Sequence, residues 1–269
     1  MERYIVERRP GGPRVLLLHG LTGSPVELWP LAEGLAEAGW RVELPLWPGH
    51  GASPDVLART TPVELLSAAR TLGSEDADAV VGFSMGGLLA FVTAASAARP
   101  MPLVLLAPAV TMAGSAKLFD RLGTLPWLPS SVLLDKGSGE QTGHALPDTS
   151  LDQPGRTAMA SAPRLVPVRY ERVPLIWARH LRTIRHAAHA AAGALGGRAL
   201  ALHGTGDRTA DASSLDRLPS WSPSVAWDCR RIAGAPHQLA TSPWRGLVTD
   251  AVATFLASAA GNALHGGLV

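Results

Sequence analysis

Short apolar runs alternate with stretches of helical pattern between Arg14 and Ala107, and this alternation limits the folds open to the chain. The first run, Arg14–His19, reads RVLLLH and is typical of a strand that is buried on both faces. The other predicted strands are Arg41–Leu44, Ala79–Phe83 and Leu103–Ala107. Strands that alternate with helices indicate a mostly parallel sheet with helices on both of its faces, so the predicted fold class is α/β.

Two capping signatures predict where helices start. Ser24–Glu27 reads SPVE and Thr61–Glu64 reads TPVE, and in both a hydroxyl residue is followed by proline and then by glutamate. The first helix is expected to reach Ala38 and the second to reach about Thr71. A third helix, rich in alanine and glycine, is expected over Met85–Ala98.

The alternation stops after residue 110, where a proline- and glycine-rich stretch begins. A stretch of this length inside an α/β chain is typical of an insertion. We therefore expect the core at 1–110 and 181–260, an insertion at 111–180 and a disordered tail at 261–269. The second part of the core is expected to contain a helix at Leu181–Gly193, strands at Arg198–His203 and Val225–Ile232, and a closing helix at Pro243–Ala260.

Charge and composition exclude several classes of protein. The formal net charge is only +2, and no block of like charges reaches five residues, so nothing points to nucleic acid as a partner. The single cysteine, Cys229, can form no internal disulfide and no multi-thiolate zinc site. No apolar stretch approaches the roughly 18 residues of a membrane helix, and the N-terminus lacks the apolar core of a signal peptide. We expect a cytoplasmic protein with no integral membrane segment.

Residues 82–86 read GFSMG, which fits the pattern G-x-S-x-G between a predicted strand and a predicted helix. A sharp turn at this place forces the serine into a strained backbone conformation, and the small flanking residues let neighbouring backbone pass. The serine Oγ then projects above the sheet at a helix N-terminus, where free N–H groups favour negative charge. Ser84 is therefore the predicted nucleophile.

A serine nucleophile needs a base, and the base needs an orienting carboxylate. In this architecture the chain order is serine, acid, histidine. Asp207 follows the strand Arg198–His203 directly after a glycine-flanked turn, and we favour it over Asp211, which fits a helix cap. Of the nine histidines, only His237 lies beyond the last strand and before the last helix, so it is the predicted base.

The reaction develops a negative charge on oxygen, which two preorganised N–H donors must stabilise. The first expected donor is the backbone N–H of Met85, which follows the nucleophile. The second is the backbone N–H of Leu21, in the loop after the first strand. We expect His19 and Gly20 to shape this loop without entering the chemistry.

Four segments together resemble the serine α/β-hydrolases, and most closely the bacterial carboxylesterases and monoacylglycerol lipases. They are LLLHGLTGSPVELWPLAEGLAEAGWRVELPLWPGHGASP, GFSMGG, LHGTGD and GAPH. The resemblance covers about 14–106 and 199–256, and it implies a cap domain inserted after Leu103–Ala107 above an acyl-binding pocket. Ser84, Asp207 and His237 match the family's triad positions. One departure is Pro236, where the family usually has glycine before the histidine.

These residues predict hydrolysis of a carboxylic ester of short to medium acyl length, or of a monoacylglycerol-like ester, through an acyl-enzyme. No cofactor and no metal is expected, since neither H-E-x-x-H nor G-x-x-x-x-G-K-[ST] occurs. The same triad would serve a thioesterase, lactonase, amidase or acyltransferase, and these alternatives stay open. A ligand-binding protein with an inactive site is the alternative of another class. The expected partner is a small-molecule ester, and the sequence predicts no oligomeric state.

An apolar stripe lies early in the insertion, and its members are Leu118, Phe119, Leu122, Leu125, Trp127 and Leu128. One interpretation is that the stripe docks the insertion on the sheet domain. The other is that part of it, with Phe119, Leu122 and Trp127 as candidates, forms the roof of an apolar acyl pocket above Ser84.

Overall fold

A seven-stranded sheet forms the centre of the computed structural model, which describes residues 1–125, 127–129, 132–135, 170 and 172–265. Its strands, in spatial order, are β1 (Arg3–Val6), β3 (Arg41–Pro45), β2 (Arg14–Leu18), β4 (Ala79–Phe83), β5 (Leu103–Leu106), β8 (Gly197–Gly204) and β9 (Val225–Ile232). All neighbouring pairs are parallel except β1 and β3. The predicted mostly parallel sheet is therefore confirmed.

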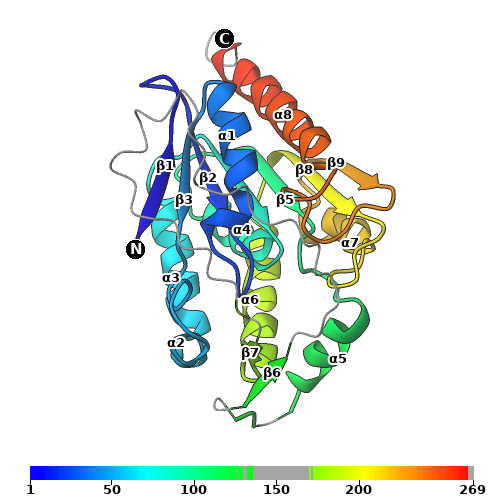
Figure 1. The fold of residues 1–269 in the computed structure, drawn as a ribbon. Coiled ribbons are helices and arrows are strands. Elements are labelled where there is room, and N and C mark those ends of the chain that lie inside the picture. The colour runs from blue at the N-terminus through cyan, green and yellow to red at the C-terminus, as the bar shows by residue number, and fades with distance from the viewer. Residues whose placement is uncertain (126, 130–131, 136–169, 171, 266–269) are drawn as a thin grey trace.

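Helices cover both faces of this sheet (Figure 1). One face carries α1 (Trp29–Glu37) and α8 (Arg245–His265), and the other carries α3 (Pro62–Gly73), α4 (Met85–Ala95), α6 (Trp177–Ala192) and α7 (Ser214–Trp221). Strand β2 shows why its sequence is apolar throughout. Leu16 and Leu18 pack into the cluster under α4, whereas Val15 and Leu17 pack under α1. Because successive side chains point to opposite faces, a strand between two helix layers needs apolar residues at every position.

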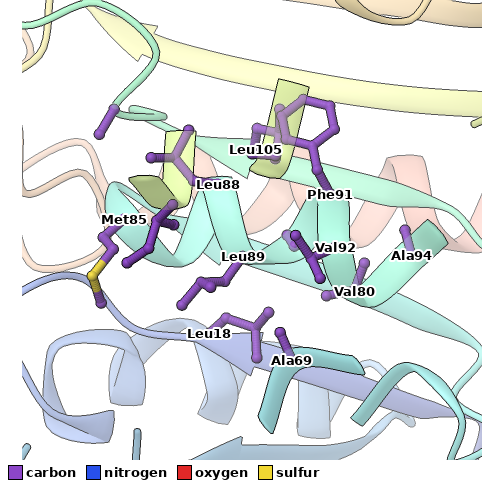
Figure 2. Close-up of a cluster of buried hydrophobic side chains, with 14 of the residues drawn as sticks. Leu18, Ala69, Val80, Met85, Leu88, Leu89, Phe91, Val92, Ala94 and Leu105 are labelled. Carbon is purple, nitrogen blue, oxygen red and sulfur yellow. The ribbon is translucent and has the colours of Figure 1, made fainter. Parts of the chain in front are cut away.

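Helix α4 is enclosed on all sides (Figure 2). Its residues from Met85 to Ala94 are all buried. Leu18, Val80 and Leu105 come from the sheet beneath it, and Ala69 comes from α3 beside it. The small side chains of this helix allow α3, α6 and the sheet to approach it closely. The helix that begins at Met85 is therefore fixed by packing from Met85 to Ala94.

The two capping signatures have different outcomes. At Thr61 the predicted capping box is present, with Thr61 Oγ1 accepting from Glu64 N–H and Glu64 accepting from Thr61 N–H. At Ser24 it is absent, and the prediction was wrong there. Pro25–Leu28 forms a short 3₁₀ helix ahead of α1, and the Glu27 carboxylate accepts from Gly20 N–H at 2.5 Å. The Glu27 carboxylate thus binds the backbone of the loop after β2 instead of the N-terminus of the helix.

Outside the insertion, strand β1 and the short helix α2 (Pro54–Arg59) have no counterpart in the sequence prediction. Strand β1 lies at the edge of the sheet, where charged residues can face solvent, and Arg3 pairs there with Glu75. An edge strand of this kind lacks the apolar run that marks the interior strands. Helix α6 begins at Trp177 rather than Leu181. Helix α8 ends at His265, so it includes the first residues of the segment expected to be disordered.

The described part of the insertion contains α5 (Gly114–Leu122) and the antiparallel pair β6 (Leu133–Asp135) and β7 (Arg172–Pro174). Residues 136–169, within the expected cap, lie outside the described residues, and so do 266–269 of the expected tail. The cap at 111–180 therefore stays a prediction. None of the helices in the described residues combines the length and apolarity needed to cross a membrane.

Candidate active site

Ser84 stands in the turn between β4 and α4 with φ 55° and ψ −117°. Such a conformation at a residue other than glycine costs ~1–3 kcal/mol, so the surroundings must hold it. Ser84 N–H donates to Leu106 O, and Ser84 O accepts from Ala109 N–H, which ties the turn to β5. A methyl group on Gly82 would collide with Gly86 O, and one on Gly86 would collide with Leu18 O. The two glycines of G-x-S-x-G are thus required by close backbone approach.

The structure brings Ser84, His237 and Asp207 together at the carboxyl ends of β4, β8 and β9. His237 Nε2 lies 3.0 Å from Ser84 Oγ, and His237 Nδ1 lies 2.7 Å from Asp207 Oδ2. Ser84 is 9% exposed and His237 is 6% exposed, whereas the Asp207 side chain is fully buried. The Phe83 ring packs against the His237 ring at 4.9 Å between centroids. Pro236 has not displaced the imidazole from the serine.

The Asp207 carboxylate lies among four nitrogen groups. Oδ1 accepts from Thr209 N–H at 2.8 Å and from Ala210 N–H at 2.9 Å. Oδ2 faces His237 Nδ1 and also lies 3.1 Å from Nε2 of His203. Burial alone would raise the pKa of Asp207, but the hydrogen bonds from His203, His237 and Thr209 hold that pKa well below its usual range. The carboxylate is therefore ionised at neutral pH.

Asp211, the competing acid, lies elsewhere. Its side chain is exposed, and Oδ1 accepts from Ser213 N–H at the start of α7. This contact lowers the pKa of Asp211. The N-cap position of α7 is Ser213, so Asp211 lies two residues before the cap that the sequence analysis assigned to it. Of the two carboxylates, only Asp207 reaches His237.

The loop after β2, which contains the predicted donor Leu21, lies beside the turn of Ser84. A Cβ on Gly20 would come within 3.3 Å of the Phe83 ring, which directly precedes the serine. Glu27 holds this loop by accepting from Gly20 N–H. Among the described residues, the backbone N–H groups of Leu21 and Met85 donate to no acceptor, as donors kept for a substrate oxygen would require.

His19 supports the same loop from below. Its Nδ1 donates to Gly20 O at 2.9 Å, and its Nε2 accepts from Trp47 N–H at 3.2 Å. Complete burial, together with the neighbouring His50, lowers the pKa of His19 well below the usual value. His19 is therefore a neutral structural residue, in agreement with its expected role.

The predicted acyl-binding residues lie in three different environments. Phe119 packs against the core cluster under α4, Leu122 is half-buried, and Trp127 is 74% exposed. Helix α5 is fastened to α6 by Asp120, whose carboxylate contacts Arg182 and Arg185. This arrangement favours docking for the inner side of the stripe and leaves the Trp127 side chain mostly in contact with solvent. No group of three or more metal-binding side chains gathers within the residues that the structure describes.

Several residues at the site had no role in the sequence prediction. Glu27 was assigned to a helix cap, and His203 was noted only as the end of a strand. Thr209 and Ala210 act through backbone N–H groups, which leave no signal in residue identity. The motif HGTGD was itself visible, so an imidazole four residues before the acid was the one available signal.

Comparison with known proteins identifies the fold. A family model described as alpha/beta hydrolase fold matches residues 13–137. A solved structure described with two metagenome-derived lipolytic enzymes superposes with a TM-score of 0.73 at 22% identity, covering 96% of this chain and 97% of that one. A monoacylglycerol lipase from Paleococcus ferrophilus gives a TM-score of 0.68 at 21% identity, covering 96% and 99%. The chain has the α/β-hydrolase fold.

Two relatives found by sequence are ester-cleaving enzymes by name. A thermostable monoacylglycerol lipase from Bacillus sp. (strain H-257) is 47% identical over 60 residues, which are 22% of this chain and 23% of that protein. A carboxylesterase from Bacillus subtilis (strain 168) is 33% identical over 84 residues, which are 29% and 34% of the two chains. The matched segments thus span 23% and 34% of the length of these relatives. The resemblance to esterases and lipases expected from the motifs is found.

Proposed function

We propose that this protein is a serine hydrolase that cleaves carboxylic esters through an acyl-enzyme. The observation that carries the proposal is the continuous chain of contacts from Ser84 Oγ through His237 to the buried Asp207 carboxylate, at 3.0 Å and 2.7 Å. A chain of this kind activates a hydroxyl that is otherwise a weak nucleophile. The lipase and carboxylesterase among the relatives support an ester as the substrate.

The geometry assigns the proton movements. Because Asp207 Oδ2 accepts from His237 Nδ1, the neutral imidazole has its free lone pair on Nε2, facing Ser84 Oγ. Ser84 Oγ attacks the ester carbonyl while Nε2 takes its proton, and Asp207 stabilises the resulting imidazolium. The same Nε2 then donates that proton to the leaving alcohol, which departs and leaves the acyl group on Ser84. Water activated by His237 attacks the acyl-enzyme and releases the acid.

We assign the stabilisation of the negative oxygen to the backbone N–H groups of Met85 and Leu21. Met85 opens α4, so its N–H also lies at the positive end of a helix dipole. Leu21 belongs to the loop that Glu27 holds at Gly20. Removal of one such donor from a hydrolase costs about 2.7–4 kcal/mol of transition-state stabilisation.

Labelling with a fluorophosphonate tests the proposal. We expect the wild-type protein to gain one phosphonyl group at Ser84, measured by intact mass and peptide mapping. Ser84→Ala should lose both the label and ester turnover, and Ser67→Ala, at an exposed serine of α3, should lose neither. Absence of labelling in the wild type would favour a non-catalytic ligand-binding protein, and a label on another residue would overturn the assignment of Ser84 as the nucleophile.

The acyl specificity is a separate question, and a series of nitrophenyl esters with glycerides and acyl-thioesters answers it. We propose short to medium acyl chains or a monoacylglycerol-like ester, with kcat/KM rising by a few-fold per CH₂ until the pocket is full. Faster turnover of thioesters or lactones, or transfer to an added alcohol, would favour the alternative chemistries. Trp127→Ala should leave the chain-length profile unchanged because that side chain is exposed. The cytoplasmic location stays a prediction.

A further inference from the structure

A second imidazole lies against the acid of the proposed triad. His203 is near the end of β8 and is completely buried. Its Nε2 lies 3.1 Å from Asp207 Oδ2, the same oxygen that faces His237 Nδ1 at 2.7 Å. Its Nε2 also lies 3.2 Å from Ala210 O. One carboxylate oxygen is thus shared by two histidines, His203 of β8 and His237 of the loop that follows β9.

The surroundings of His203 fix which nitrogen carries its proton. Both groups near Nε2 are acceptors, the carboxylate of Asp207 and the carbonyl of Ala210, so Nε2 must be the donor. Nδ1 is buried and has no hydrogen-bond partner among the described residues. A proton on Nδ1 would be a buried donor without an acceptor, which is costlier than an unused lone pair. The neutral Nε2–H tautomer is the one that satisfies this site.

We propose that His203 is a positioning residue that sets how strongly the Asp207 carboxylate acts on His237; the inference rests on the proposed hydrolase function. With His203 donating, Oδ2 accepts from two imidazoles and Oδ1 from two backbone N–H groups, so every acceptor direction of the carboxylate is occupied. The carboxylate cannot rotate without losing several of these bonds. The charge on Oδ2 is also shared, so His237 receives only part of it.

Within the residues that the structure describes, the titratable groups that interact with this pair can be named. Asp207 and His237 contact each other, and His203 also interacts with Asp211, which in turn interacts with Lys117. If the donor on His203 is removed, the full charge of Oδ2 falls on His237 and favours its protonated form. The acidic limb of the pH profile should then move to higher pH. A residue that merely filled space at 203 would leave the limb where it is.

Two variants separate these roles. His203→Gln keeps an N–H donor close to the position of Nε2, and His203→Met keeps the volume without a donor. We expect His203→Met to lower kcat about tenfold with little change in KM, and to raise the acidic limb by about half a pH unit. His203→Gln should restore both values to near those of the wild type. His186→Met, exposed on α6, is the matched control and should alter neither.

Nitrogen-15 NMR of the wild-type protein gives a test that needs no variant. We expect His203 to have its proton on Nε2 and a bare Nδ1 throughout the pH range of activity. A proton on Nδ1 alone, or identical kcat and pH profiles in the Gln and Met variants, would overturn the proposal. If the His203→Met protein does not fold, the tautomer of His203 in the wild-type protein tests the proposal by itself. A wild type that neither binds fluorophosphonate nor cleaves esters would refute the proposed hydrolase, while the tautomer would still report on the second imidazole.

Discussion

Replacement of Asp207 by asparagine should abolish most of the activity by changing the tautomer of His237. In Asp207→Asn the amide oxygen will occupy the place of Oδ1, because the backbone N–H groups of Thr209 and Ala210 can only donate there. The two imidazoles that face Oδ2 can instead change tautomer. The amide NH₂ group then takes the place of Oδ2 and faces His237 Nδ1. Two donors cannot face each other, so His237 must move its proton to Nε2, where it points at Ser84 Oγ and cannot accept a proton.

The expected loss follows from this geometry. With the wrong tautomer, the base is absent although the side chains keep their places, and a loss of kcat of about 10⁴-fold is the size such a change causes in a serine hydrolase. That factor corresponds to about 5.4 kcal/mol of transition-state stabilisation. Asp211→Asn is the matched control. Its side chain is exposed and accepts a hydrogen bond from Ser213 N–H without reaching His237, so its kcat should stay within about twofold and its stability within about 0.5 kcal/mol of wild type.

The assay is the initial rate of hydrolysis of a short nitrophenyl ester at saturating concentration, with circular dichroism as a check that both variants are folded. Traces of other esterases in a preparation set the lowest measurable rate. Each variant is therefore compared with Ser84→Ala prepared in the same way, which gives the background rate. A folded Asp207→Asn protein that keeps more than a tenth of the wild-type kcat would refute the tautomer argument. A large loss of kcat in Asp211→Asn, with none in Asp207→Asn, would show that Asp211 is the acid of the triad and that the assignment of Asp207 is wrong.

Three further outcomes are expected. Glu27→Ala should lower kcat about tenfold by freeing the loop at Gly20, and Glu27→Gln, which keeps the acceptor, should lose much less; equal kcat in the two variants would count against the loop contact. The pKa of His19 is lowered by burial and by His50, so below about pH 6.5 the unfolded chain binds a proton that the folded chain does not. The free energy of unfolding should therefore fall with decreasing pH by up to about 1.4 kcal/mol per unit from this side chain, and urea titrations from pH 7.5 to 5.5 should show a shallower slope in His19→Gln. Thr61→Ala should cost about 1 kcal/mol of stability in urea unfolding, and Ser24→Ala, which removes no cap hydrogen bond, should cost less.

The sequence predicted the interior of the sheet well because burial on both faces forces an apolar run. Strand β4 has the same bounds in prediction and structure, and β9 does too. Three residues far apart in the chain also met as expected. Ser84, Asp207 and His237 each follow a parallel strand, and the carboxyl ends of parallel strands share one edge of the sheet. Chain order and strand ends were sufficient to find them.

Elements governed by competition between partners were not predictable. Glu27 had two possible acceptor roles, and only the folded loop shows that Gly20 N–H takes it in place of the helix N-terminus. Strand β1 forms by pairing with the open edge of β3. An edge strand of this kind needs no apolar run, so the sequence pattern does not predict it. The contact between His203 and Asp207 depends on the direction of the His203 side chain at the end of β8. An apolar strand pattern does not predict that direction. Boundaries of α6 and α8 follow from packing and moved by several residues.

The enclosure of α4 has a consequence for how this chain can change over evolutionary time. Every residue from Met85 to Ala94 is buried between the sheet and the neighbouring helices, so an added methylene at any of them must push one of these elements aside. A push along this helix also moves the turn that holds Ser84. Little variation along α4 is therefore compatible with activity. A mutational library aimed at a new substrate should leave α4 untouched and place its diversity around 111–180.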